Sequence, residues 1–209
     1  MKKLFIAAAA LLLFVTGAAA YEVQNGTGYF EVEKGSLSIF KQNVTAYLVI
    51  DYSSTEVVEF GKKNQISKNL GPVDAYMESK GQQWVEDWPI MKENTQARAE
   101  EEINKRNKMK IVDKSEAQYE VRLVITHLDF GNTGVSMFHN PFANEDGGAK
   151  IEGRLIVTEI ASGAVACDMR IDWVQGVGNY TQNQRMMYTV GTALFGKFIP
   201  KFAGKLKAN

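Results

Sequence analysis

Apolar and polar side chains alternate most clearly over two stretches of the chain, residues 44–52 and 119–126. In each stretch Val, Ile, Leu, Ala or Tyr returns at every second position. Successive side chains of a β-strand point to opposite faces, so a period of two is typical of a strand. The sequence therefore predicts one strand at each of these places.

Two further alternating stretches, residues 151–160 and 164–174, are separated only by Ala161, Ser162 and Gly163. Small and polar residues with a glycine are typical of the tight turn between antiparallel strands. The second half of the chain therefore predicts a β-hairpin.

Two helices are predicted, one over residues 82–107 and one in the C-terminal segment. The first contains Ala97–Glu102, a run of good helix formers. The second begins at Thr181, which forms a capping-box pattern with Gln184. Pro200 should end or kink the second helix, because proline lacks an amide hydrogen. Its apolar residues recur at helical spacing, namely Met187, Val190, Leu194, Phe198 and Phe202.

The order of these elements is strand, helix, strand, hairpin, helix, which predicts an α/β (α+β) fold. We expect a mixed β-sheet with a C-terminal hairpin, packed by two main helices. The path from the first strand through the 82–107 helix to the next strand favours one parallel crossover. Residues 53–80 show neither period clearly and contain the breaker Gly71–Pro72. They predict an irregular segment within a single domain of residues 21–209.

The first twenty residues have the three-part pattern of a secretory signal peptide. Lys2 and Lys3 precede an unbroken apolar run, and small residues follow at Gly17–Ala20. The run is shorter than the roughly 20 apolar residues of a membrane span. We therefore expect cleavage after Ala20, with Tyr21 as the first residue of a periplasmic or extracellular protein.

Removal of residues 1–20 from the 209-residue chain leaves 189 residues, enough for one domain with its own core. The chain has 24 basic and 24 acidic residues, so loss of Lys2 and Lys3 leaves 22 against 24. This balance argues against nucleic acid as a partner. The one cysteine, Cys167, excludes an internal disulfide and is interpreted as a buried apolar residue. We also expect no transmembrane segment in the mature chain.

Catalytic motifs are absent from the sequence. It has no phosphate-binding Gly-x-x-x-x-Gly-Lys-Ser/Thr, no Gly-x-Ser-x-Gly and no His-Glu-x-x-His. His127 and Asp129 would share one face of a strand, and with His139 they form a possible metal-ligand set. Two histidines twelve residues apart have no metal-site spacing, however, so we assign no metal, no cofactor and no catalytic residue.

Two groups of aromatic residues are candidate binding residues. The connection 131–148 contains Phe138, His139, Pro141 and Phe142, and so many apolar groups in a loop need either cover from the protein or a partner. Trp84 and Trp88 lie one helical turn apart. They are interpreted as core anchors, with the alternative that they line a ligand cleft between helix and sheet.

A family resemblance appears between Tyr119 and Phe202. The matching segments are Leu128–Asn132, Lys150–Val157, Ser162–Val165, Val174–Gly176 and Leu194–Ile199. In these segments the chain resembles uncharacterised exported proteins of bacteria, whose α/β domain is distantly similar to the amino-terminal domain of TolB and to envelope assembly lipoproteins. The resemblance implies an α/β fold in the cell envelope. Unlike those lipoproteins, this chain has Tyr21 and no cysteine after the expected cleavage site.

The sequence leads to three functional hypotheses. The first is a non-enzymatic binding or assembly accessory of the bacterial cell envelope, with an envelope protein as partner of the 131–148 loop. The second is a carrier of a small ligand, either lipid or sugar, lined by Trp84 and Trp88. The third is a hydrolase that uses His127 and Asp129.

Overall fold

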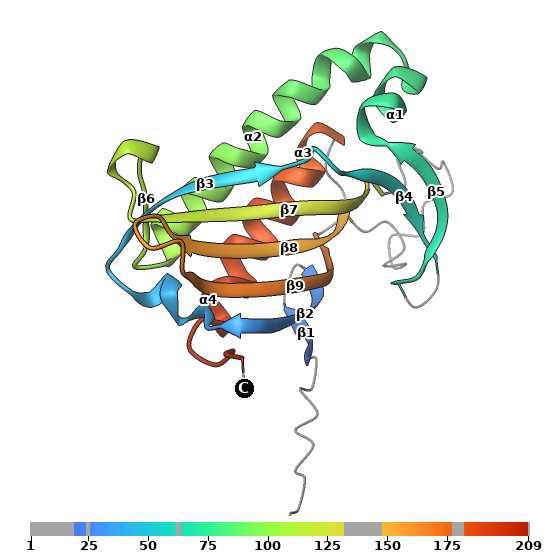
Figure 1. The fold of residues 1–209 in the computed structure, drawn as a ribbon. Coiled ribbons are helices and arrows are strands. Elements are labelled where there is room, and N and C mark those ends of the chain that lie inside the picture. The colour runs from blue at the N-terminus through green and yellow to red at the C-terminus, as the bar shows by residue number, and fades with distance from the viewer. Residues whose placement is uncertain (1–18, 24–25, 62–63, 132–147, 177–181, 209) are drawn as a thin grey trace, which may run out of the picture.

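The computed structural model describes residues 19–23, 26–61, 64–131, 148–176 and 182–208 (Figure 1). Within these ranges nine strands form a single sheet. No helix in the described part of the chain is long and apolar enough to cross a membrane. The strands are β1 (Ala19–Val23), β2 (Gly26–Gly35), β3 (Thr45–Asp51), β4 (Glu56–Phe60), β5 (Ile66–Pro72), β6 (Lys110–Ile111), β7 (Tyr119–Asp129), β8 (Lys150–Glu159) and β9 (Val165–Gln175).

The sheet is mixed, with the order β1-β2-β9-β8-β7-β3-β6. Strands β2, β9, β8 and β7 are antiparallel neighbours, and β8 and β9 are the hairpin predicted from the sequence. Strand β3 lies parallel to β7, from Ala46 opposite Tyr119 to Asp51 opposite Val124. Because the long helix lies between them in the chain, this pair is the expected parallel crossover. The α+β prediction is therefore confirmed.

The described part of residues 53–80, which leaves out 62 and 63, is not irregular, contrary to the sequence-based expectation. It forms β4, β5 and the short helix α1 (Val73–Lys80). Strand β4 continues the edge begun by β3, pairing with the end of β7 at His127 and Leu128, and β5 pairs with β4. Most of β5 is exposed and α1 has only eight residues, so neither leaves a clear apolar period in the sequence.

Two main helical segments cover one face of the sheet (Figure 1). The first is α2 (Gln82–Arg106), as predicted. The second is continuous and consists of α3 (Gln182–Met186), the π-helix η4 (Met187–Phe198) and α4 (Ile199–Phe202). Pro200 lies in the first turn of α4, so the helical segment continues past it to Phe202. Short 3-10 turns, η1 (Leu37–Lys41) and η3 (Lys114–Glu116), complete the described elements.

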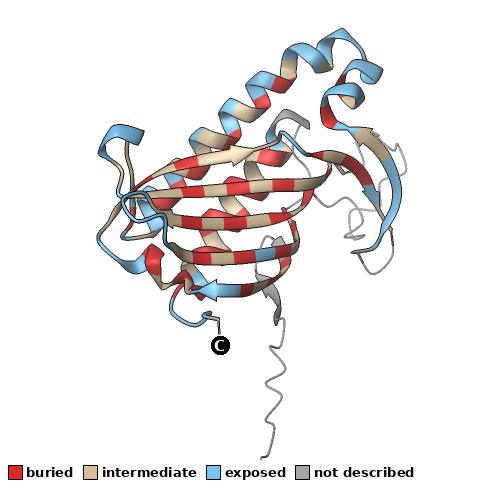
Figure 2. Ribbon diagram, in the orientation of Figure 1, coloured by how far each residue is buried: buried red, intermediate tan, exposed pale blue. Residues whose placement is uncertain are grey.

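Burial alternates along the central strands, and this alternation separates the two faces of the sheet (Figure 2). Side chains that point toward α2 and η4 are apolar and almost fully buried, as at Leu123, Leu155 and Met169. The opposite side is called the open face here, and no helix among the described residues covers it (Figure 1). It presents charged side chains, among them Glu120, Arg122, Glu152, Arg154, Asp168 and Arg170.

Candidate functional site

The open face carries a network of ion pairs across three strands. Arg154 of β8 binds both carboxylate oxygens of Asp168 on β9, at 2.6 and 2.9 Å, and also contacts Glu33 of β2. Arg170 binds Glu31 at 2.8 Å, Glu33 at 3.2 Å and Asp172 at 2.8 Å. Neighbouring carboxylates raise the pKa of both guanidinium groups. The network therefore holds long side chains in fixed positions on an otherwise solvated surface.

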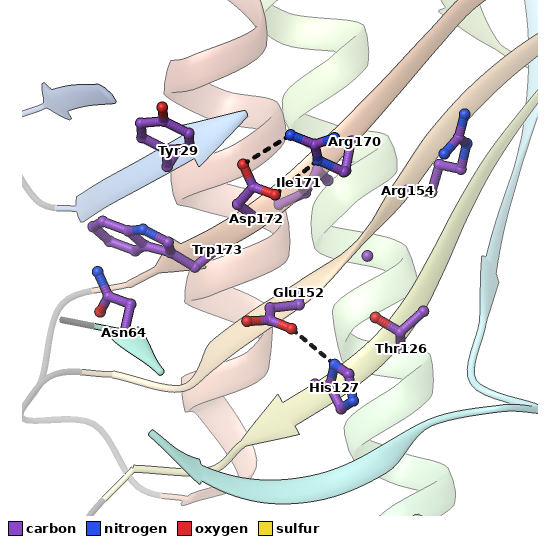
Figure 3. Close-up of a pocket in the computed structure, with 11 residues that line it drawn as sticks. Tyr29, Asn64, Thr126, His127, Glu152, Arg154, Arg170, Ile171, Asp172 and Trp173 are labelled. Atoms are coloured by element: carbon purple, nitrogen blue, oxygen red, sulfur yellow. Dashed lines mark hydrogen bonds and ion pairs between the residues drawn. The ribbon is translucent and has the colours of Figure 1, made fainter. Parts of the chain in front are cut away.

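A pocket of about 640 Å³ lies beside this network, on the open face (Figure 3). We call it the open-face pocket. Strands β2, β7, β8 and β9 supply its walls, and Asn64, just before β5, closes one side. Its lining residues are Tyr29, Asn64, Thr126, His127, Glu152, Gly153, Arg154, Arg170, Ile171, Asp172 and Trp173.

The pocket is built on two β-bulges that face each other across β8. Thr126 is an extra residue in β7, between Ile125 opposite Gly153 and His127 opposite Glu152. Strand β9 also has an extra residue, because Gly153 pairs with Ile171 while Ile151 pairs with Val174. Bulges redirect side chains and are frequent at functional sites. Here residues at both bulges, Thr126 and His127 on β7 and Asp172 and Trp173 on β9, line the pocket together with Glu152.

Gly153 permits the close strand contact beside the bulges. A Cβ atom at this position would lie 2.1 Å from the carbonyl oxygen of Val124. No residue with a Cβ atom fits at this distance, because the carbonyl oxygen belongs to the backbone and cannot rotate away as a side chain can. Glycine is therefore required where β7 and β8 approach each other at the base of the pocket.

Glu152 is the central ionisable group of the pocket. Its Oε2 lies 2.8 Å from Nδ1 of His127 (Figure 3). While Glu152 is ionised it can only accept, and in that state Nδ1–H of His127 donates this hydrogen bond. Burial raises the pKa of the Glu152 carboxyl, nearby Asp172 raises it further, and the bond from His127 opposes the change. The environment thus disfavours the charged form of Glu152.

Lys150 lies behind the pocket lining and connects two lining residues, Asn64 and Trp173, to the β4–β5 hairpin. Its ammonium group donates to Oδ1 of Asn64 at 2.8 Å. The same group lies 4.8 Å from the ring centroid of Phe60 and 5.7 Å from that of Trp173, as in cation–π contacts. Burial lowers the pKa of Lys150, while Asp129 and Glu152 act in the opposite direction. The hairpin is thereby attached to the open face.

The predicted tryptophan pair lies away from the open-face pocket. Trp88 is only 5 % exposed and packs edge-on against Tyr52. Trp84 is partly buried and packs against Tyr76 and Phe130. Their interpretation as core anchors agrees with these contacts. Neither residue lines the open-face pocket, and the alternative, a separate ligand cleft between helix and sheet, stays a prediction.

The remaining candidates of the sequence analysis are the loop residues and the pair His127 and Asp129. Phe138, His139, Pro141 and Phe142 lie outside the described residues. Asp129 accepts hydrogen bonds from the amides of Phe60 and Gly131, at 3.0 and 2.8 Å. His127 does lie in a polar pocket, but its partner is Glu152 and not Asp129. Among the described residues no three His, Cys, Asp or Glu side chains are grouped as metal ligands.

Sequence reasoning missed Glu152, Asp172 and Trp173. Charged residues at every second position, 152 and 154 on one strand and 168, 170 and 172 on the next, do indicate a polar sheet face. The two β-bulges leave no comparable pattern in the sequence. They depend on pairing between strands, so the convergence of these side chains appears only in the structure.

No protein-family model matches the sequence, and no curated protein matches it. Among solved structures, the chain is similar to a PelC dodecamer from Paraburkholderia phytofirmans, with 9 % sequence identity and a TM-score of 0.41. The match covers 82 % of this chain and 96 % of that one. A PelC variant from the same organism gives 9 % identity, a TM-score of 0.37, and coverage of 82 % and 95 %. At these values the similarity establishes neither a family nor a function.

Proposed function

We propose that this protein is an exported, non-enzymatic binding protein of the bacterial cell envelope, and that the open-face pocket holds a small polar ligand. The signal-peptide pattern of residues 1–20 and the resemblance to exported proteins support the location. The pocket supports the binding role, because a concave site with a few convergent polar groups is the usual form of a ligand site.

The observation that carries the proposal is the environment of Glu152. Its carboxylate is kept in a partly buried position that disfavours its charge, between two bulges that interrupt the sheet. Perturbed ionisable groups cluster at functional sites, and so do such irregularities of strand pairing. We therefore assign the Glu152 carboxylate to ligand binding, because its site disfavours its charge and offers the sheet no gain in stability from it.

Native mass spectrometry of protein purified from the envelope fraction tests this proposal. We expect an additional mass of a small molecule that is released on denaturation. The bound mass should be lost from Trp173→Leu and retained by the matched control Trp84→Leu, whose side chain lies in the aromatic cluster with Tyr76 and Phe130. A bound mass that is equal in both variants contradicts a site at the open-face pocket.

An envelope protein as a second partner stays a prediction from the sequence. Phe138 and Phe142 would contact it, so Phe138→Ser with Phe142→Ser should abolish its capture from envelope extract. The matched control is Phe60→Ser, which removes a comparable aromatic side chain from the described β4–β5 hairpin. If the double variant captures the same proteins as the wild type, the loop is not the binding surface.

A hydrolase is the second candidate function, because His127 and Glu152 form a hydrogen-bonded pair inside a polar pocket. A carboxyl with a raised pKa is suited to general-acid catalysis. The assay is release of nitrophenol from nitrophenyl esters and glycosides. Turnover that is lost in both His127→Asn and Glu152→Gln favours the hydrolase, and absence of turnover in the wild type favours the binding protein.

A further inference from the structure

The geometry points to a carbohydrate as the ligand of the open-face pocket, with one uncharged sugar ring seated between Glu152 and Trp173. This inference rests on the proposed binding function and specifies its ligand class. It depends on three features of the pocket: its unused hydrogen-bonding atoms, its aromatic wall and its balance of charge.

The unused polar atoms include both acceptors and donors. Glu152 binds His127 through Oε2, and its Oε1 has no hydrogen-bond partner among the described residues. Asn64 uses Oδ1 for Lys150, which leaves its Nδ2 as a donor in the pocket wall. Arg154 uses Nε and Nη2 for carboxylates, and its Nη1 has no partner in the described part of the chain. Each hydroxyl of a sugar both donates and accepts, so it can satisfy such a mixed set.

The aromatic wall consists of Trp173 and Tyr29, which lie opposite each other on β9 and β2 (Figure 3). The face of an aromatic ring carries partial negative charge. The C–H groups of a sugar ring carry partial positive charge and present a flat apolar surface. A ring packed on Trp173 would therefore direct its hydroxyls toward Glu152 and Asn64.

The charges in and around the pocket argue against ionic ligands. Each of Arg154 and Arg170 is already bonded to at least two carboxylates, so neither guanidinium of the described pocket lining is left for an ion pair with a phosphate or carboxylate. A cationic ligand would meet the ammonium of Lys150, which already lies 5.7 Å from the Trp173 ring centroid. An acyl chain would leave the polar groups of the wall without partners. A neutral polyhydroxyl ring avoids all three conflicts.

Saturation-transfer NMR on the mature protein tests the inference. The sugar probes are the methyl glycosides of glucose, galactose, mannose and N-acetylglucosamine, and the comparison probes are ethanolamine, inorganic phosphate and octanoate. We expect transfer to the ring protons of at least one glycoside. Glu152→Gln should weaken that binding about tenfold, because it removes a charged acceptor.

The matched control is Glu120→Gln, since Glu120 lies on the same face with the same side-chain exposure, 23 %, but outside the pocket lining. Trp173→Leu should abolish transfer and Trp173→Phe should retain part of it, which separates loss of stacking from loss of folding. Binding of only ethanolamine, phosphate or octanoate overturns the sugar assignment and leaves the proposed binding function standing. Absence of binding by all seven probes, together with no co-purified mass, overturns both.

Discussion

At the scale of single residues, the open-face pocket holds the carboxylate Glu152 in a site that disfavours its charged form. Glu152 has a raised pKa chiefly because burial removes water from its charged form. A group whose pKa is higher in the folded than in the unfolded protein costs stability once it ionises. Between its ordinary value of 4.5 and the raised folded-state value, stability falls as the pH rises. The carboxylate therefore reduces stability at neutral pH, as expected of a functional group.

Glu152→Gln should consequently stabilise the protein while it weakens ligand binding. The amide keeps the shape and still accepts from His127, but it has no charge to desolvate. We expect the melting temperature at pH 7 to rise by about 1–3 °C, measured by scanning calorimetry. The difference from wild type should vanish below pH 4, where Glu152 is protonated in both the folded and unfolded states. A lower melting temperature for the variant at pH 7 would contradict this account.

Cys167 gives a second prediction at this scale. It is fully buried on the core face of β9, and burial raises the pKa of its thiol to about 12. The thiolate is the reactive form, so the native protein should not react with a thiol reagent at pH 8. After unfolding in guanidinium chloride, one thiol per chain should react. Rapid labelling of the folded protein would show that this strand opens or that the thiol is exposed.

At the scale of elements, the fold depends on how closely α2 approaches η4. Glycines of η4 face long side chains of α2, with Gly191 against Arg98 and Gly196 against Glu102. Glu102 is buried, and Arg98 and Arg106 bind it at 2.6 and 3.0 Å. The glycines thus leave room for a charged triad between the two helices.

Gly191→Ala should therefore destabilise the protein, although alanine is the better helix former. The new Cβ would lie 2.4 Å from Cγ and 2.9 Å from Cβ of Arg98, atoms near the backbone that cannot move away easily. Overpacking of this kind costs about 1–3 kcal/mol, more than the roughly 1 kcal/mol gained in helix propensity. Urea unfolding measures the change as a lower midpoint with an unaltered slope.

The control for this substitution is Gly204→Ala. Its Cβ would meet only the flexible end of Lys41, at 2.7 Å from Nζ, so the midpoint should change little. If the unfolding midpoint falls equally in both variants, the loss comes from replacing a glycine as such and not from the contact between the helices.

Elements with a clear local signal were predictable, and those without one were not. Strands β7, β8 and β9 bury alternate side chains, so their positions follow from the apolar period. Helix α2 also buries the polar residues Thr95 and Glu102, and it was predictable from its good helix formers instead. Strand β5 is mostly exposed, and it is a strand because it pairs with β4, which its own sequence does not indicate. The candidate site was missed for a related reason, since the bulges at Thr126 and Asp172 arise from pairing between strands.

At the scale of the whole molecule, the two faces of the sheet have separate roles. The face under α2 and η4 holds the apolar core, including Phe195 and Phe198, and stabilises the fold through burial. The open face contributes ion pairs, which add little stability when exposed to water, and it carries the pocket. Changes on the open face can therefore alter binding with small effects on folding, which is why its variants are informative.

Export is the property on which the proposed envelope role depends, and it leads to the last prediction. Strand β1 spans Ala19–Val23, with Tyr21 opposite Gly28, so cleavage after Ala20 would leave Tyr21–Val23 to pair with β2. We expect the protein recovered from the periplasm or medium to begin at Tyr21, as measured by N-terminal sequencing and intact mass. Ala18→Arg should block processing, because the peptidase requires a small residue there, while Ala9→Leu should not. A chain that begins at Met1 in the cytosol would remove the basis for an envelope role.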